Sequence, residues 1–470
     1  AAIIDEHATL PTVTITNKDH DTLAEALRSS ASGSVTITLT YSDQAPVTDM
    51  PMVYPTSSWG VSPDLTLKPE ITAPGGNVVS AGYLDQYVRM TGTSQASPHV
   101  AGVAALVRER IASDPLFARM SHADKDAVVA NILMGTAHPL QDVEQRNGTY
   151  YSPRRVGAGL VDAVAATTTA VYPTVEGASD PSRPKADLGD GTQGWSFTVR
   201  LTNLSGDDHT YTLGGQALSP TIEGNSFTFR STNWTNTGIG LAFSTDSVTV
   251  PAKSSATVTV TVTPKGEFAS YANANAPKGT FIDGVVTFTS REGQPDLTVP
   301  YMGFYGSWGD PSVFDSKWDG NENAGVHLYG STLKNLMSSM PLGDVNPLYN
   351  HDDIREAQQS DPNLFYVSLS EEYLAPSRIG PSTYTLRPAR TLTYSYLNEA
   401  GQVVRAYTRS HVRASLHDHE LLYGLLGANV EDWTHEPSFD GYDEAGNELP
   451  DGSYKLVIEA ETYAPSSAKQ

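Results

Sequence analysis

The chain contains no cysteine among its 470 residues. This absence excludes disulfide bonds and zinc sites built on thiolates. A protein that works outside a cell without disulfides must hold its fold through its hydrophobic cores alone. A chain of this length, with 39% hydrophobic residues, can bury more than one such core. We therefore expect several domains that are stabilised by packing rather than by covalent cross-links.

Basic residues are scarce: 30 Lys and Arg stand against 53 Asp and Glu, which gives a formal net charge of −23. Nucleic-acid phosphates are bound by clustered Lys and Arg, so this composition argues against a nucleic-acid partner. No apolar run reaches the roughly 20 residues that a membrane-spanning helix needs. The carboxylate surplus suits an extracellular protein. Structural calcium is left open, with no ligands assigned and the metal sites unknown.

The two ends of the sequence also lack expected features. The chain starts at Ala1 without an initiator Met or a signal peptide, and it stops at Gln470 soon after a strand-like run at 455–460. We expect both ends to fall inside domains. The chain is then the C-terminal part of a longer protein.

The chain divides into four regions that differ in their residue patterns. Residues 1–45 show a strand, helix, strand pattern and are too few for a domain, so we expect them to be the end of one. Residues 46–172 combine a Pro/Gly-rich stretch with two predicted helices, which favours an α/β domain. Residues 173–310 and 311–470 show short alternating strands separated by turn residues. That pattern predicts two β-sandwiches, of which the second is truncated.

The two helices of the α/β region are predicted at about 97–111 and about 124–134. Ser121 and Asp124 have the spacing of a capping box for the second helix. The first helix contains many small residues, which predicts that it passes through a crowded core. Gly102 within it costs about 1 kcal/mol relative to alanine, so we expect close packing at that position.

One segment carries the candidate chemistry, and residues 92–102 of it read GTSQASPHVAG. Gly92 permits a sharp backbone turn, which places Ser94 at the start of the first helix. The free N–H groups and the positive dipole end of a helix favour developing negative charge there. Pro98 is tolerated because it falls in the first helical turn. The pattern therefore predicts an activated serine at a helix N-terminus.

This segment resembles the nucleophile motif of the subtilisin-like serine proteases, G-T-S-x-A-S-P-H-V-A-G, and matches it at every fixed position. Residues 57–60 and 67–75 resemble the stretch that precedes that nucleophile, and residues 157–163 resemble the close of the catalytic domain. The resemblance implies that Ser94 attacks the scissile carbonyl and forms an acyl-enzyme. It also implies that Thr93 and the backbone N–H of Ser94 support the oxyanion hole.

A narrower resemblance is to cell-envelope proteases of the lactocepin and C5a-peptidase type. It implies that residues 1–45 end an inserted protease-associated domain and that 46–172 are the C-terminal part of a subtilisin-like catalytic domain. Residues 173–310 and 311–470 would be fibronectin type III-like sandwiches. The implied location is secreted or attached to the cell wall of a Gram-positive bacterium.

The family motifs that carry the catalytic Asp and His, of D-T-G and H-G-T type, do not occur in this sequence. The family's oxyanion Asn also lies upstream of the matching region. A serine without a base is a weak nucleophile, so we expect no meaningful peptidase activity from the isolated chain. Truncation, a two-chain enzyme with the missing residues on a partner fragment, and a degenerate pseudo-protease are the alternatives. The intact nucleophile motif argues against the last.

Histidines within the chain offer other candidates. His99 is near Ser94 in sequence, but a base must lie within hydrogen-bond reach, and five residues along a helix turn the ring away into the packing. The family motif has a structural histidine there, so we assign His99 a structural role. His417 and His419 share a strand face but lack a third metal ligand, so a turn or strand edge is favoured. The Asp-rich stretch 440–451 does not have EF-hand spacing.

Together these observations predict a serine endopeptidase that hydrolyses peptide bonds in extracellular proteins through Ser94, as part of a longer or two-chain enzyme. The chemistry requires no cofactor. The partners would be protein or peptide substrates and the missing N-terminal catalytic portion. The alternative is a non-catalytic cell-surface binding module of adhesin type, in which the protease segment is a relic.

Overall fold

The computed structural model describes residues 24–30, 51–143, 145, 147–223, 226–314, 332–335, 340–341, 379–382, 385–412 and 439–463. The chain divides into two compact units, Ala1–Pro51 and Met52–Gln470. In the first unit the described residues are helical at 24–29. This agrees with the helix predicted around these residues, while the strands predicted at either side of it lie outside the described residues.

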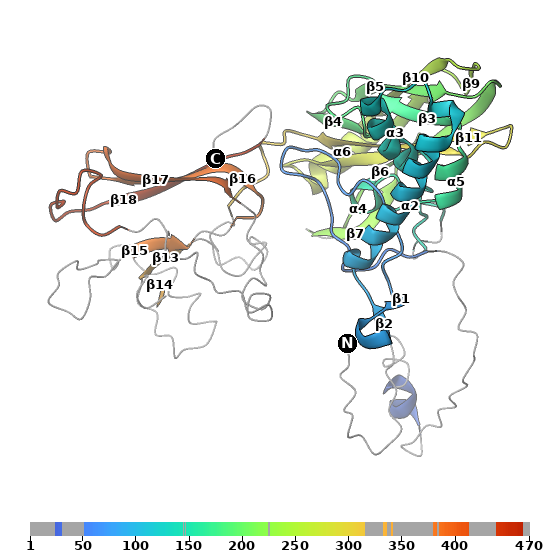
Figure 1. Cartoon of the computed structure of the whole chain (residues 1–470). Helices are drawn as coiled ribbons and strands as arrows, with labels where there is room; N and C mark the ends of the chain where they lie inside the picture. The colour runs from blue at the N-terminus through green and yellow to red at the C-terminus, as the bar shows by residue number, and fades with distance from the viewer. Residues whose placement is uncertain are drawn as a thin grey trace. The chain divides into compact units, whose positions relative to one another are not determined.

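The helical segment, residues 52–170, begins with an antiparallel hairpin and continues as helices (Figure 1). Its elements are β1 (Val78–Ala81), η1 (Tyr83–Asp85), β2 (Tyr87–Met90), α2 (Thr93–Ser113), η2 (Pro115–Phe117), α3 (His122–Gly135), α4 (Pro153–Val156) and α5 (Ala163–Thr168). The predicted helices at 97–111 and 124–134 correspond to α2 and α3, each slightly longer than expected. Ser121 caps α3 by accepting the Asp124 N–H, which confirms the predicted capping residue.

The helices of this segment pack through one apolar cluster contributed by α2, η2, α3 and α5. Its buried members are Val107, Ile111, Phe117, Val128, Val129, Ile132, Leu133 and Ala166. The first half of α2 stays outside this cluster, because only Val107 and Ile111 of the whole helix are buried. A Cβ added at Gly102 would meet nothing within 4 Å, so the predicted close packing there is wrong for this chain. Gly102 therefore has no packing partner among the described residues.

The first sandwich, residues 171–305, packs two sheets face to face. Its elements are β3 (Val171–Val175), β4 (Ala186–Gly191), β5 (Trp195–Asn203), β6 (His209–Glu223), β7 (Ser226–Asn233), β8 (Ile239–Phe243), β9 (Ser247–Val250), β10 (Ser255–Pro264), α6 (Gly266–Asn275), β11 (Thr280–Ser290) and β12 (Leu297–Tyr305). The strand orders are β3-β5-β10-β8 and β4-β12-β11-β6-β7, with β9 also paired to β6. The alternation of β5 and β10 sends every second side chain into the core.

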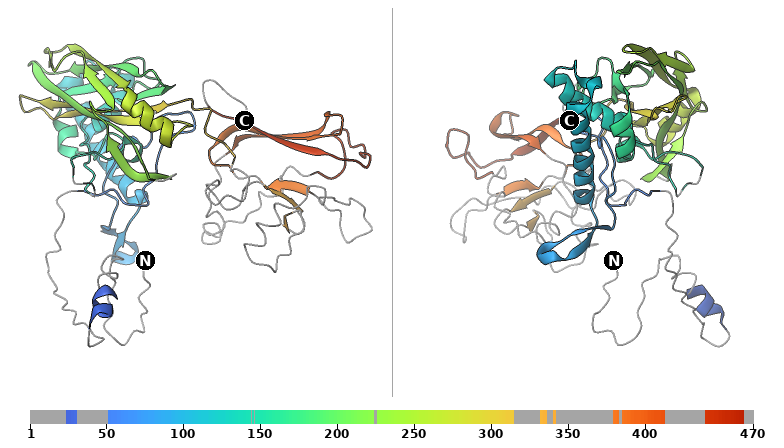
Figure 2. Two further views of the ribbon diagram at one scale, coloured as in Figure 1. Left: turned by 180° about the vertical axis from the view of Figure 1, so that it is seen from behind. Right: turned by 45° about the vertical axis from the view of Figure 1, so that its right-hand side comes forward.

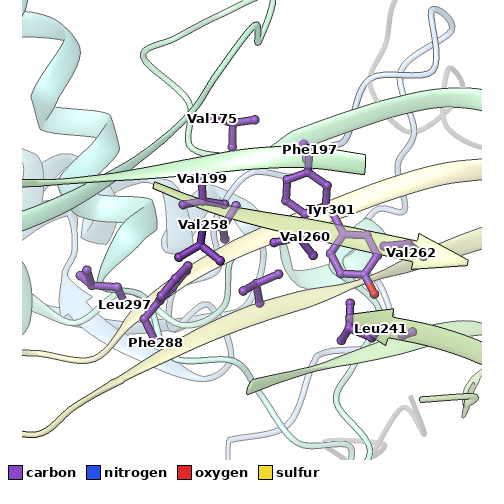
Figure 3. Packing of buried hydrophobic residues seen from close by; sticks show 14 of the residues in the cluster. Val175, Phe197, Val199, Leu241, Val258, Val260, Val262, Phe288, Leu297 and Tyr301 are labelled. Carbon is purple, nitrogen blue, oxygen red and sulfur yellow. The ribbon is translucent and has the colours of Figure 1, made fainter. Parts of the chain in front are cut away.

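The core of the first sandwich lies between the two sheets. Figure 3 shows Phe197 from β5 and Tyr301 from β12 facing each other across this space, and their ring centroids are 5.7 Å apart. Val199, Val258 and Val260 surround them, all fully buried. The alternating strands seen in the sequence thus form the predicted sandwich, because their apolar faces have a second sheet to pack against.

The C-terminal residues form two further three-stranded sheets (Figure 2). One has the order β14-β13-β15, from Met340–Pro341, Thr332–Asn335 and Ile379–Ser382, and the other has the order β17-β16-β18. The second sheet comprises β16 (Ala389–Leu397), β17 (Val403–Val412) and β18 (Lys455–Glu461). The run predicted as a strand at 455–460 is therefore a strand. Among the described residues no helix has both the length and the apolarity to cross a membrane.

Buried polar contacts join the helical segment to the first sandwich. The Arg154 guanidinium of α4 pairs with Asp283 of β11 at 2.6 Å, with the two side chains 8% and 1% exposed. Ser152 donates its hydroxyl to the same carboxylate oxygen at 2.6 Å. The Gln216 side chain of β6 accepts the Tyr150 N–H and donates to the Gly148 carbonyl. The sandwich is thus packed directly against the segment that carries Ser94.

Candidate active site

Ser94 is the second residue of α2 and is exposed to solvent. The hairpin β1–β2 leads into the helix through Thr91 and Gly92, where the chain changes from extended to helical backbone (Figure 1). Among the described residues, nothing accepts a hydrogen bond from the Ser94 N–H or contacts its hydroxyl. This is the position at a helix start that the sequence predicted for Ser94, with a free donor beside the hydroxyl oxygen.

Thr93 is the first residue of α2 and is also exposed. Its proposed support of an oxyanion hole, together with the Ser94 N–H, remains a prediction. Its placement is compatible with that role, because N–H groups in the first helical turn lack partners within the helix. The helix carries no acidic residue in its first turn to compete for those donors.

The stretch Ala73–Gly75 holds the turn that precedes Ser94. The Gly92 N–H donates to the Gly75 carbonyl at 2.8 Å. A Cβ added at Gly75 would lie 2.7 Å from the Gly92 carbonyl oxygen, so only glycine permits this approach. Two residues further along, the Asn77 N–H donates to the Thr91 hydroxyl at 2.9 Å. The flanking motif read from the sequence is therefore in direct contact with the nucleophile turn.

His99 also binds this stretch rather than Ser94. Its Nδ1–H donates to the Pro74 carbonyl at 2.8 Å. That bond fixes the ring toward Ala73–Gly75 and agrees with a structural role. The ring is exposed, however, so the expectation that it lies deep in the packing is wrong. The reason is the same as for Gly102: the described residues bury no side chain in the first half of α2.

A strap at residues 65–70 connects this stretch to the first sandwich. The Leu67 N–H donates to the Asp187 carboxylate at 2.6 Å, and the Leu67 carbonyl accepts from Lys185 at 2.8 Å. Lys185 is only 6% exposed. Its ammonium also lies 3.5 Å from Glu70 and 3.6 Å from Asp187. The sandwich strand β4 therefore anchors the strap, and the strap continues directly into Ala73–Gly75.

The two carboxyl groups on this anchor respond differently to their surroundings. Burial acts to raise the pKa of Glu70, but the nearby Lys68, Lys185 and Arg183 outweigh it and hold the pKa below its ordinary value. Burial dominates at Asp187 and raises its pKa, in spite of the Leu67 N–H and Lys185. The sequence could not reveal this anchor, because Leu67 and Asp187 are 120 residues apart.

A second pair that the sequence reasoning missed joins His138 and Asp162. The His138 Nε2–H donates to the Asp162 carboxylate at 2.6 Å, and Asp162 caps α5 by accepting the Ala165 N–H. Partial burial acts to raise the pKa of Asp162, but the hydrogen bonds from Ala165 and His138 outweigh it and hold the pKa below 3.8. An Asp directly before a helix was an available capping signal.

Asp162→Ala is expected to lower the free energy of unfolding by about 1 kcal/mol at neutral pH, because it removes the α5 cap. A folded-state pKa below the unfolded value means that this contribution is present above the unfolded pKa and is lost as the pH falls through the folded pKa. Urea unfolding at pH 7 and at pH 3 should therefore show a smaller difference between variant and parent at the lower pH. Asp162→Asn keeps a capping oxygen and should lose less at neutral pH; an equal loss would contradict the capping role.

The remaining sequence candidates lie in the C-terminal part. His417 and His419 lie outside the described residues. In the stretch 440–451, Asp443 accepts the Ala445 and Asn447 N–H groups and so closes a turn. These bonds lower the pKa of Asp443, led by those from Asn447. Within the described ranges, no group of three or more His, Asp or Glu side chains is placed to hold a metal ion.

Two parts of the chain match known protein families. Residues 5–159 match the subtilase family, and residues 187–302 match an Fn3-like domain. The subtilase match includes Ser94, the strap and the segment that closes with Gly159. Over residues 5–159 the chain is similar to the subtilase family, and this subtilase-like part is followed by the Fn3-like sandwich.

Two kinds of proteinase are among the proteins to which this chain is similar. It is 27% identical over 434 residues to a PII-type proteinase of Lactococcus lactis subsp. cremoris, which covers 86% of this chain and 21% of that protein. It is 26% identical over 467 residues to a C5a peptidase of Streptococcus pyogenes, which covers 88% of this chain and 38% of that protein. The chain thus spans about a fifth of the length of the lactococcal relative. These similarities confirm the resemblance to cell-envelope proteases of the lactocepin and C5a-peptidase type.

Proposed function

We propose that this chain supplies the nucleophile-bearing part of a secreted or cell-wall-attached serine endopeptidase. The observation that carries the proposal is Ser94, exposed at the start of α2 with an N–H beside its hydroxyl for which the described residues provide no acceptor. A nucleophile on the first turn of a helix places the forming oxyanion near backbone donors and the positive end of the dipole. The proteinase relatives support the reaction class.

The proposed reaction proceeds through an acyl-enzyme on Ser94. The Ser94 hydroxyl adds to the scissile carbonyl and transfers its proton to a histidine, which then protonates the leaving amine. The Ser94 N–H and Thr93 would support the oxyanion. The His, its Asp partner and the oxyanion Asn are proposed to come from a preceding portion of a longer protein or from a partner fragment. No cofactor takes part, and calcium would serve only as a structural ion.

The first sandwich is proposed to brace this nucleophile rather than only to space it from a cell wall. Its anchor through Lys185 and Asp187 holds the strap, and the stretch Ala73–Gly75 that follows the strap holds the turn before Ser94. Displacing the turn by a small distance would misalign the serine, because attack requires a closely defined geometry. The substrates would be extracellular proteins or peptides.

A fluorophosphonate probe tests the proposal, because it labels only an activated serine. A longer protein that contains this chain together with a subtilase Asp and His is expected to be labelled at Ser94. The isolated chain is expected to remain unlabelled and to hydrolyse no casein, since it has no base for Ser94. Absence of labelling in the folded longer protein would favour the relic, adhesin-like module instead. Casein hydrolysis by the isolated chain, abolished by Ser94→Ala, would overturn the expected dependence on a preceding portion.

A further inference from the structure

A buried cluster between α4 and the sandwich holds more positive than negative charge. It contains the guanidinium groups of Arg154 and Arg155, which are 6% and 7% exposed. Asp283 pairs with Arg154 at 2.6 Å. No described carboxylate lies within ion-pair distance of Arg155. One positive charge is therefore buried without a counter-ion, a costly arrangement unless an anion completes it.

Two unpaired donors mark where that anion would bind. The Arg155 Nε–H and the Trp59 indole N–H are both buried, and no described group accepts a hydrogen bond from either. The Arg155 guanidinium carbon lies 5.4 Å from the centre of the Trp59 ring, so the side chains that carry the two donors are neighbours. Buried donors without acceptors are rare in proteins, and each costs the desolvation of its N–H group.

Aromatic rings lie around this site, and one of them is exposed to solvent. The Arg155 guanidinium also lies 5.5 Å from the Tyr151 ring and 6.0 Å from the Phe229 ring. Tyr151 is buried, whereas Phe229 on the sandwich strand β7 is 70% exposed. The Phe229 and Trp59 ring centroids are 6.3 Å apart, so the cluster reaches the surface at Phe229. Cation–π contacts hold the guanidinium in place but accept none of its N–H groups in a hydrogen bond.

We propose that Trp59 and Arg155 form a binding site for a carboxylate group that enters on the Phe229 side. A single uncompensated positive charge matches a monoanion, and the planar guanidinium fork matches the two oxygens of a carboxylate. The carboxylate would belong to a free organic acid or to an acidic side chain of a polypeptide. The site is separate from Ser94, and the inference does not depend on the proposed function.

Nitrogen-detected chemical shifts test the site directly in the intact chain. The Trp59 indole N–H and the Arg155 Nε–H signals are assigned with Trp59→Phe and Arg155→Lys and are followed during titration with sodium acetate. Sodium chloride at equal ionic strength is the reference. We expect both signals to move saturably with acetate and not with chloride. Arg155→Lys keeps the charge but loses the Nε–H, and it should weaken the acetate response of the Trp59 signal by about tenfold or more.

Two control variants separate the loss of acetate binding from a general effect of the substitution. Arg200→Lys, at the exposed pair with Glu176, is the matched substitution and should leave the titration unchanged. If Arg155→Lys does not fold, as judged by its thermal unfolding, Trp59→Phe is used instead. It keeps an aromatic side chain at this position, and acetate binding is then followed through the Arg155 Nε–H signal. That variant should bind acetate severalfold more weakly, about fivefold for one lost hydrogen bond.

A second titration separates the sources of the carboxylate. The peptide acetyl-Gly-Glu-Gly-amide is compared with its Gln counterpart and with acetate. Tighter binding of the Glu peptide than of acetate indicates a polypeptide source, and tighter binding of acetate indicates a free acid. Equal responses to the Glu and Gln peptides together with no saturable response to acetate would overturn the proposal, as would equal shifts with chloride.

Discussion

Ser94→Ala in a longer protein that also carries the subtilase Asp and His is expected to lower kcat by roughly 10⁶-fold, the loss found when a triad serine is removed. In the proposed mechanism the hydroxyl oxygen of Ser94 forms the acyl-enzyme, and alanine has no atom that could replace it. His99 donates its Nδ1–H to the Pro74 carbonyl, and among the described residues it forms no hydrogen bond with Ser94. Steady-state hydrolysis of a fluorogenic peptide measures the effect.

The size of the loss separates a nucleophile from a merely structural serine. Ser113 lies at the other end of α2, and its hydroxyl bonds to the Glu109 carbonyl. Ser113→Ala is the matched control and should leave kcat unchanged. KM should change little in Ser94→Ala, since the serine acts in the transition state rather than in substrate binding. A Ser94→Ala enzyme with activity close to the parent would remove Ser94 from the mechanism.

Local signals explain why the sequence predicted the nucleophile and most regular elements. A complete motif at 92–102 fixed Ser94 at a helix start, and its flanks identified the stretch that touches the turn. The Ser121 capping signal predicted the start of α3, and the alternation within residues 173–310 predicted a sandwich, which β5 and β10 help to form. Each of these features depends only on residues that are close to one another in the sequence.

Contacts between distant residues explain what the sequence did not reveal. The Leu67–Asp187 anchor and the Arg154–Asp283 pair join residues 120 and 129 positions apart. Nothing in the spacing of charged residues distinguishes such buried pairs from solvated ones. The exposure of His99 was missed for a related reason: the motif predicts a helix but not what covers it. The carboxylate site proposed at Trp59 also depends on residues that are distant in the sequence, because the Arg155 guanidinium reaches the Trp59 ring only in the folded chain.

Asp283→Ala is expected to lower the free energy of unfolding by about 3–5 kcal/mol, because it leaves the Arg154 charge buried without its partner. Ser152 loses its acceptor in the same variant, since its hydroxyl bonds to the same carboxylate oxygen. Urea unfolding followed by tryptophan fluorescence measures the change, and hydrogen exchange locates it in α4 and β11. Glu176→Ala, which breaks the exposed pair with Arg200, should cost only about 0–1 kcal/mol.

The double variant Arg154→Met with Asp283→Leu separates the energy of the pair from the cost of an unpaired charge. Replacing both partners of a buried ion pair by apolar residues is often close to neutral. The double variant should therefore recover most of the stability that Asp283→Ala loses. A double variant as unstable as Asp283→Ala would mean that the pair itself, rather than the orphaned guanidinium, stabilises the junction. The junction would then need its charges, and the anchoring of the sandwich to the Ser94 segment would rest on electrostatics instead of packing.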